Sequence, residues 1–288
     1  MLILAHEVNL CFTTLIQMLD HPKNDIFIHM NAKNTSYNPE ETLKLVKHSR
    51  LFQVPRIKVA WGAYSQLEAV LSLFETAAAQ EHYEHYHIMS GADLPIKKQD
   101  ELIDFFERHH GVEFISIDKD CAKYEYRMKY YYLFQELKGR SGNLILRILN
   151  KMCIILQKIM HVHRNKDTIC QKGSDWFSIS DELVRYMLSK KDWIHKVFHH
   201  TILPTEQCIH ILATNSHFRD NLYCKELMNN SEKADMRLID WARGYDAHPH
   251  VFRMSDLEMI QNSEAMFARK FMPSVDAEII QKIRELYS

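Results

Sequence analysis

The first thirty residues constrain the fold most, because two short apolar runs enclose one segment of helical periodicity. Leu2–Ala5 and 25–29 carry the apolar and β-branched residues of buried strands, and the apolar positions of 10–19 repeat with helical spacing. A strand, a helix and a second strand in succession are typical of the βαβ unit, whose strands lie parallel in one sheet. The opening therefore predicts an α/β fold built on a mainly parallel sheet.

The same alternation continues on both sides of one interruption. Short apolar runs predict further strands at 57–61, 85–89 and 114–117. Helical spacing predicts helices at 65–79, 100–109, 181–189, 206–214, 255–267 and 276–287. A chain of 288 residues with 46% hydrophobic content suits one large domain of this kind.

The interruption, residues 123–166, is strongly basic. It holds ten Lys or Arg residues and only two acids, Glu125 and Glu136, and it includes the apolar run 144–160. We predict a basic helical insertion at this point. Two interpretations stay open: a helical subdomain whose basic face is solvated, or a surface that contacts an anionic membrane.

The overall charge and the cysteine pattern limit the partners and the cellular compartment that we expect for this chain. The formal net charge is −1, so the whole chain offers no attraction for nucleic acid, and we expect no such partner. Six scattered cysteines without a CxxC pair are typical of reduced thiols. The N-terminal run lacks a basic region and a cleavage site, and no apolar stretch reaches the roughly 18 residues of a membrane span. We expect a cytoplasmic protein, peripheral at the inner face of the membrane where 123–166 contacts it.

Four short motifs occur in order along the chain. They are SGADLP at 90–95, GSDWFSIS at 173–180, PTEQ at 204–207 and FARKF at 267–271. Each motif is modest alone, but together the chain resembles a family of glycosyltransferases, in a bacterial style. This family includes the core-2/I-branching β-1,6-N-acetylglucosaminyltransferases and the peptide O-xylosyltransferases. The resemblance implies a GT-A-like, Rossmann-type α/β fold that binds a nucleotide sugar on a mixed, mainly parallel sheet.

The resemblance also implies how the chain is divided and what it does. It predicts a single glycosyltransferase domain over 1–288. Within it, 1–120 is the nucleotide-binding half, 121–170 the basic helical insertion, and 171–288 the half that binds acceptor and diphosphate. The implied reaction is a metal-independent, inverting transfer from UDP-N-acetylglucosamine or UDP-xylose to a hydroxyl of a glycan or lipid-linked glycan, in surface polysaccharide synthesis.

The diphosphate of the donor is expected at Arg269 and Lys270. Arg offers a planar fork of donors and Lys a mobile charge, and the resemblance matches the pair to the family's diphosphate-binding cations. The alternative is an amphipathic helix whose charged face is solvated. Asp93 is a lone carboxylate where a metal site needs more oxygen ligands, so we expect no metal and no other cofactor. Asp93 either lies near the bound sugar or forms a turn or N-cap before the helix at 100–109.

Two other features invite a metal interpretation. Asp118 and Asp120 form the only literal Asp-x-Asp, but they fall at the start of the basic segment, where the resembled family has no metal site. The histidines cluster at 82–87, 199–200 and 248–250 without the spacing of a zinc site. We interpret the histidines as surface or capping residues, and the resemblance puts His248 near the active site.

An inverting transfer needs one base that takes a proton from the acceptor hydroxyl. The resemblance assigns this role to Glu206, although Thr205 and Glu206 also suit an ordinary helix start. Asp175 is a second candidate, because the xylosyltransferase branch has a carboxylate there and the core-2 branch has none. Trp176 beside it either stacks on a sugar ring or belongs to the core.

The resemblance puts the nucleoside at Asn31, Trp61, Gly62 and Ser65. Asn31 stands where the family has an acid, and it can still hydrogen-bond a base or ribose; Gly62 allows close backbone approach. Two rival functions stay open: a transferase that uses UDP-glucose or UDP-galactose, and a catalytically inactive glycan-binding scaffold of the same fold. The two candidate carboxylates and the adjacent cation pair argue against the scaffold.

Overall fold

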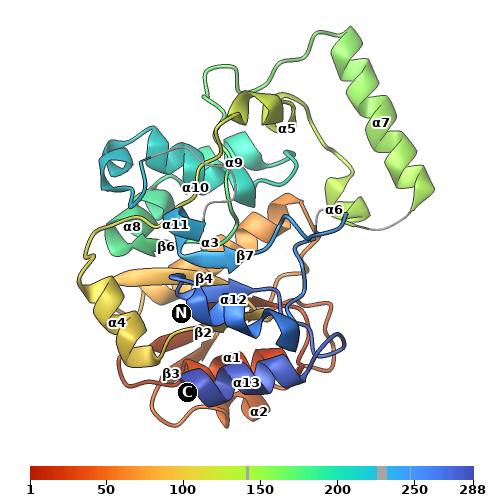
Figure 1. The fold of residues 1–288 in the computed structure, drawn as a ribbon. Helices are drawn as coiled ribbons and strands as arrows, with labels where there is room; N and C mark the ends of the chain where they lie inside the picture. Colours follow the sequence, from red (N-terminus) through yellow and green to blue (C-terminus); the bar gives the residue numbers. More distant parts are fainter. Residues whose placement is uncertain (141–142, 226–231, 247) are drawn as a thin grey trace.

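A five-stranded sheet forms the centre of the molecule (Figure 1), in a computed structural model that describes residues 1–140, 143–225, 232–246 and 248–288. Its strands are β1 (Leu2–Ala5), β2 (Asp25–Met30), β3 (Arg50–Gln53), β4 (His85–Ser90) and β6 (Ser178–Ser180), in the order β3-β2-β1-β4-β6. The first four are parallel and β6 is antiparallel to β4. The parallel order is that of a Rossmann-type unit. The predicted α/β class with a mixed, mainly parallel sheet is confirmed.

Helices cover both faces of this sheet, which is why its central strands are buried on both sides and not on alternate residues alone. All six residues of β2 are buried. Ile26 and Ile28 point into one hydrophobic cluster with α1 and α13, whereas Phe27 points into a second cluster with α3 and α8. The body helices are α1 (Leu10–Met18), α2 (Pro39–Leu43), α3 (Tyr64–Ala78), α4 (Gln99–Glu107), α8 (Asp181–Ser189), α9 (Lys191–Phe198), α10 (Thr205–Thr214), α11 (Glu232–Asp235), α12 (Leu257–Asn262) and α13 (Glu278–Tyr287).

A smaller sheet joins segments that are far apart in the chain. It consists of β5 (Asp93–Pro95), β8 (Phe267–Arg269) and β7 (Arg237–Ile239), in the order β5-β8-β7. Strand β8 pairs antiparallel with β5, so that Asp93 lies opposite Arg269, and parallel with β7. Two of the four sequence motifs therefore meet in one ladder.

The basic segment is a helical insertion, as predicted. It contains the 3-10 turn η1 (Cys121–Tyr124) and the helices α5 (Tyr126–Lys129), α6 (Gln135–Lys138) and α7 (Leu144–Ile159). Figure 1 shows α7, in light green, standing away from the body of the protein. Two further 3-10 turns, η2 (His217–Asn221) and η3 (Met254–Asp256), lie in the body. Among the described residues, no helix is both long enough and apolar enough to cross a bilayer.

Two of the predicted strands are wrong. The segment 57–61 is not a strand, because its amides bond to side chains: Ile57 N–H donates to His29 Nε2 at 3.0 Å and Val59 N–H to Asn31 Oδ1 at 3.3 Å. The third parallel strand is β3 instead. The segment 114–117 forms only isolated bridges, from Phe114 to Ser178 and from Ile117 to Gly173.

The predicted helix at 255–267 is also wrong beyond Asn262. Helix α12 ends there, Ser263 adopts an extended backbone, and the chain enters β8 with Phe267 and Ala268 fully buried. Arg269 therefore lies on a strand, not on the solvated face of a helix. Asp93 is not an N-cap, because it belongs to β5 and α4 begins after Lys98.

Candidate active site

Asp93 and Arg269 form a buried ion pair at the edge where β4 ends. Arg269 Nη1 lies 2.6 Å from Asp93 Oδ1, and the side chains are 17% and 3% exposed. The same carboxylate accepts hydrogen bonds from the backbone N–H of Ser90 at 2.7 Å and from its hydroxyl at 2.8 Å. Arg269 also donates to the Ser90 hydroxyl. Both charges are satisfied within the protein, so Asp93 acts here as the anchor that aims Arg269.

Trp176 connects this ion pair to the segment that carries the candidate base. The Arg269 guanidinium lies over the Trp176 ring, 4.3 Å from its centre, a distance at which a cation–π contact is strong. The indole thus stacks on the arginine, and Trp176 is half-buried.

Lys270 differs from its neighbour because its ammonium has no hydrogen bond or ion pair with the part of the chain that the structure describes. Burial lowers the pKa of Lys270, and the positive charges of Arg269 and Arg140 lower it further. The half-buried Lys270 therefore lies near two further cations, Arg269 and the exposed Arg140, and this excess of positive charge favours an anion as its partner.

Glu206, in the first turn of α10, is held between two cations. Its Oε2 lies 2.7 Å from Arg127 Nη1 and 3.6 Å from Lys172 Nζ. Lys172 in turn pairs with Asp118 at 2.9 Å. The four side chains form a row of alternating charge, in which Asp118 pairs with Lys172.

Asp175 is the under-compensated carboxylate of the site. Burial raises its pKa to about 7, and the negative charge of Glu206 adds to the rise. The Oδ1 atom is buried and makes no hydrogen bond to any described residue. A carboxylate that titrates near neutrality and has a free oxygen is suited to accept a proton.

Gly173 explains why these two carboxylates come together. Its backbone N–H donates to the Glu206 carbonyl at 3.0 Å, which fixes the loop against the first turn of α10. A Cβ at this position would lie 1.8 Å from the Ser116 carbonyl oxygen and 2.6 Å from the His210 ring. Only glycine allows this approach, so the GSDW sequence is needed to place Asp175 beside Glu206.

The four residues predicted to bind the nucleoside lie around the start of α3. Asn31 Oδ1 orients the segment before Trp61 through Val59 N–H. Gly62 has a φ of +68° and its carbonyl accepts from Leu203 N–H at 2.8 Å, which joins this loop to the segment that leads into α10.

The helical insertion contacts two of these four residues, Ser65 and Trp61. Glu136 of α6 accepts from both the backbone N–H and the hydroxyl of Ser65, each at 2.8 Å, so it occupies the start of α3. Arg140 lies over the Trp61 ring at 5.0 Å. Burial lowers the pKa of His248 and the charge of Arg140 lowers it further, which is consistent with the expectation that His248 is near the site.

The structure brings Asp93, Trp176, Asp175, Glu206 and the two FARKF cations into one connected group, and the four nucleoside-side residues into a second group beside it. Sequence reasoning missed Arg127, Lys172 and Arg140. The local excess of cations in 123–166 was a signal for Arg127 and Arg140, but it did not indicate which of the ten cations contact the candidate site residues. Among the described residues, no cluster of three or more His, Cys, Asp or Glu side chains is arranged to share a metal ion.

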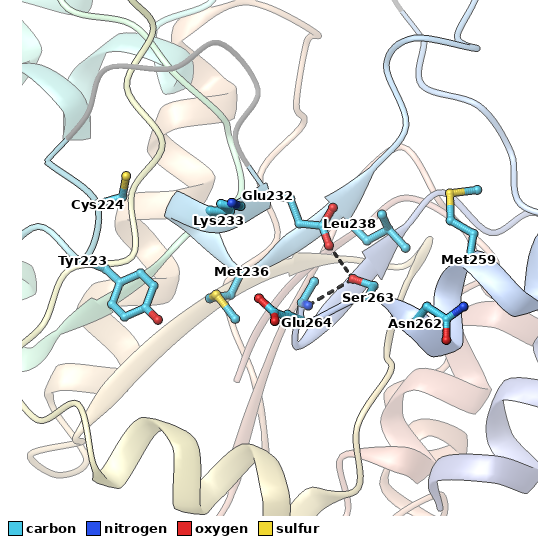
Figure 2. Close-up of a pocket in the computed structure, with 11 residues that line it drawn as sticks. Tyr223, Cys224, Glu232, Lys233, Met236, Leu238, Met259, Asn262, Ser263 and Glu264 are labelled. Atoms are coloured by element: carbon cyan, nitrogen blue, oxygen red, sulfur yellow. Dashed lines mark hydrogen bonds between the residues drawn. The ribbon is translucent and has the colours of Figure 1, made fainter.

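A hollow of about 840 Å³ lies elsewhere, along the outer edge of β7 (Figure 2). Its lining includes Met236, Leu238 and Met259 beside Glu232, and none of the predicted site residues. Glu232 accepts a hydrogen bond from the Ser263 hydroxyl. The hollow lacks the converging charges that a diphosphate needs, so we do not place the site there.

Comparison with known proteins agrees with the motifs. The model of the Core-2/I-Branching enzyme family, named Branch, matches residues 2–264. Xylosyltransferase 1 of Homo sapiens is 24% identical over 287 residues, and xylosyltransferase 2 of Rattus norvegicus is 23% identical over 287 residues. Each alignment covers 93% of this chain, which spans 28% and 31% of those two proteins.

A crystal structure of mouse xyloside xylosyltransferase 1 in its apo form covers 93% of this chain and 96% of its own, with a TM-score of 0.39 and 8% identity. The family match extends over most of the sequence and includes the first three motifs. The chain belongs to the Core-2/I-Branching enzyme family of glycosyltransferases.

Proposed function

We propose that the protein is a metal-independent, inverting glycosyltransferase that moves a sugar from a UDP-sugar to a hydroxyl of a glycan. The observation that carries this proposal is the pair of carboxylates, Asp175 and Glu206, adjoining a half-buried cation cluster. One carboxylate can take the acceptor proton while the cations receive the departing diphosphate. In this proposal 1–120 binds the nucleotide, 171–288 binds acceptor and diphosphate, and 121–170 flanks both.

The carboxylate contacts favour Asp175 as the base. Glu206 is already bound to Arg127 and Lys172, whereas Asp175 keeps a free oxygen and a pKa of about 7. Asp175 takes the proton of the acceptor hydroxyl as that oxygen forms its bond to the anomeric carbon. The bond from the anomeric carbon to the diphosphate breaks on the opposite face, and Glu206 keeps Asp175 basic through its negative charge.

The leaving diphosphate is stabilised by side-chain cations in place of a metal. Lys270 is the cation that has no hydrogen bond or ion pair among the described residues, and Arg269 is already aimed by Asp93. Arg140 supplies a third positive charge from the insertion. Charge-assisted hydrogen bonds from such groups are the strong ones, and Arg offers two in parallel.

We assign xylose or N-acetylglucosamine as the transferred sugar, with xylose first. The curated relatives are named xylosyltransferases, and a carboxylate at position 175 was expected from that branch. The acceptor in this proposal is a growing surface glycan, free or lipid-linked, at the inner face of the membrane, which the insertion would contact.

The test is release of UDP from UDP-xylose, UDP-N-acetylglucosamine, UDP-glucose and UDP-galactose, with and without a chelator. We expect release from one of the first two, unchanged by the chelator and lost in Asp175→Asn. Activity that the chelator abolishes and Mn²⁺ restores would overturn metal independence. UDP binding without release from any donor, measured with a panel of glycan acceptors, would favour the inactive glycan-binding scaffold.

A further inference from the structure

Helix α7 is attached to the protein by its polar side. Gln157 is buried and bonds twice to the backbone of Tyr131, accepting from the N–H at 2.7 Å and donating to the carbonyl at 2.9 Å. Asn150, two turns earlier, accepts from Phe134 N–H at 3.3 Å. These two side chains, seven residues apart, share one face of the helix, and this face meets the loop before α6.

The apolar side of α7 points away from the protein. Its side chains are 56–69% exposed at Leu144, Ile145, Met152, Leu156, Ile159 and Met160. A helix of a globular protein normally turns its apolar stripe to the core and its polar face to water. In α7 the orientation is inverted, so most of its hydrophobic surface has no cover within the described protein, and a contiguous exposed patch of this kind marks an interaction site.

Charge identifies the partner. The sixteen residues of α7 include Arg147, Lys151 and Lys158 and no acid, and all three cations are exposed. At about 100° per residue these cations form one stripe along the border of the apolar face. The two acids of residues 123–166 already have partners: Glu136 accepts from Ser65, and Glu125 pairs with His163.

We infer that α7 binds the surface of an anionic lipid bilayer, lying in the interface with its apolar face in the acyl region and its cations on the headgroups. A basic amphipathic helix with exposed Leu, Ile and Met has the composition of an interfacial helix, and sixteen residues at 1.5 Å each are too short to span. A second copy of the chain fits worse, because a symmetric pair of α7 helices would bring cations together without any acid to pair with.

The orientation has a consequence for the active site. Helix α6 contacts α7, and its Glu136 accepts a hydrogen bond from Ser65 at the start of α3. Arg140, two residues after α6, lies over the Trp61 ring. A bilayer bound by α7 would therefore be connected to the nucleotide side of the site through α6. The membrane inference itself rests on α7 alone and stands whether or not the proposed transfer is correct.

Co-sedimentation of the full chain with vesicles tests the inference. We expect binding to vesicles of mixed phosphatidylcholine and phosphatidylglycerol, and at least tenfold weaker binding to phosphatidylcholine alone. Because each Lys or Arg near an anionic surface contributes on the order of fivefold, Arg147→Glu/Lys151→Glu/Lys158→Glu should lose on the order of a hundredfold or more. Binding should also weaken as the salt concentration rises.

The apolar contribution is tested by Ile145→Glu/Met152→Glu, which should abolish vesicle binding and leave the unfolding temperature unchanged, because both side chains are exposed. The matched control, Leu43→Glu/Met259→Glu, changes two exposed apolar residues on α2 and α12 and should bind as the unmodified chain does. Equal vesicle binding by the α7 variant overturns the inference. So does a dimer in light scattering that this variant makes monomeric, with no vesicle binding by either protein.

Discussion

Two charged regions meet in the site, and they are built in opposite ways. Asp93 and Arg269 pair with each other, and the Asp93 carboxylate accepts two further hydrogen bonds from Ser90. Around Asp175 the charges are unbalanced, with one buried oxygen unpaired and a second carboxylate close enough to raise the pKa. The paired region fixes the position of the Arg269 side chain, and the unbalanced region contains a carboxylate that is suited to accept a proton. Substitutions in the two regions should therefore have different effects on stability and on the transfer rate.

The largest effect is expected from Asp175→Asn. The amide keeps the shape and removes the proton acceptor, so the transfer rate should fall by roughly 10²- to 10⁴-fold, while UDP affinity stays unchanged. Steady-state rates and calorimetry with UDP measure the two effects. A nearly active Asp175→Asn beside a dead Glu206→Gln would move the base to Glu206.

The pH dependence of the rate sharpens the same point. The base must be ionised, so the rate of the unmodified enzyme should rise with pH to a plateau above about pH 7, because the pKa of Asp175 is about 7. In Glu206→Gln one cause of the raised pKa is gone, and the midpoint of the profile should shift to lower pH. An unchanged midpoint would show that Glu206 does not act on the titrating group.

Breaking the paired region should cost stability. Asp93→Ala leaves Arg269 buried without its partner, and loss of one member of a buried pair typically costs about 3–5 kcal/mol of unfolding free energy. Denaturant unfolding measures the loss. Glu107→Ala, which breaks the exposed pair with Lys23, is the matched control and should change stability by less than about 1 kcal/mol. Equal effects in both variants would remove Asp93 from the frame.

Asp175 should have the opposite effect on stability. Its folded pKa of about 7 lies above the ordinary value near 3.9, so the folded protein holds the proton more tightly between these pH values. Stability is therefore lost as pH rises from about 4 to 7. At pH 8 Asp175→Asn should be more stable than the unmodified chain, and below pH 4 this advantage should disappear. A variant that is less stable at pH 8 would contradict the raised pKa.

Lys270→Ala should weaken UDP binding by about 1.5–3 kcal/mol, because one charge-assisted hydrogen bond to the diphosphate is lost. Calorimetry with UDP measures this loss, and uridine, which has no phosphate, should bind equally to both proteins. Lys282→Ala, an exposed lysine of α13, is the control. Unchanged UDP affinity in Lys270→Ala would place the anion elsewhere.

The smallest effect is expected from Arg140→Ala. The side chain is exposed and its charge is screened, so UDP affinity should fall by roughly two- to fivefold, and less at high salt. Calorimetry at two salt concentrations measures it. A loss as large as that of Lys270→Ala would mean that the insertion closes over the bound donor.

The sequence could predict the parallel sheet and most helices because their apolar periods are local signals. It could not predict β8, because Phe267 and Ala268 follow a helical segment and become a strand only through pairing with the distant β5 and β7. The strand predicted at 57–61 is wrong for a similar reason, because the backbone N–H groups of Ile57 and Val59 donate to the side chains of His29 and Asn31 and not to a neighbouring strand.

The candidate site shows the same limit. The motifs located Asp175, Glu206 and Arg269, but they said nothing of what each one contacts. That Arg127 and Lys172 bind Glu206, and that Asp175 has a free oxygen, depends on loops brought together across many residues. The assignment of the base changed for this reason from Glu206, which the motif favoured, to Asp175.

The position of β8 in the middle of the smaller sheet has a consequence for synthesis. Strands β5 and β7 pair only with β8, so this sheet cannot form until residue 269 has been made. The four parallel strands are complete once residue 90 has been made. Asp93 is made soon after, but its partner Arg269 is made only near the end of synthesis. Because chains emerge and fold from the N-terminus, the growing polypeptide has all four parallel strands long before the proposed diphosphate site can form.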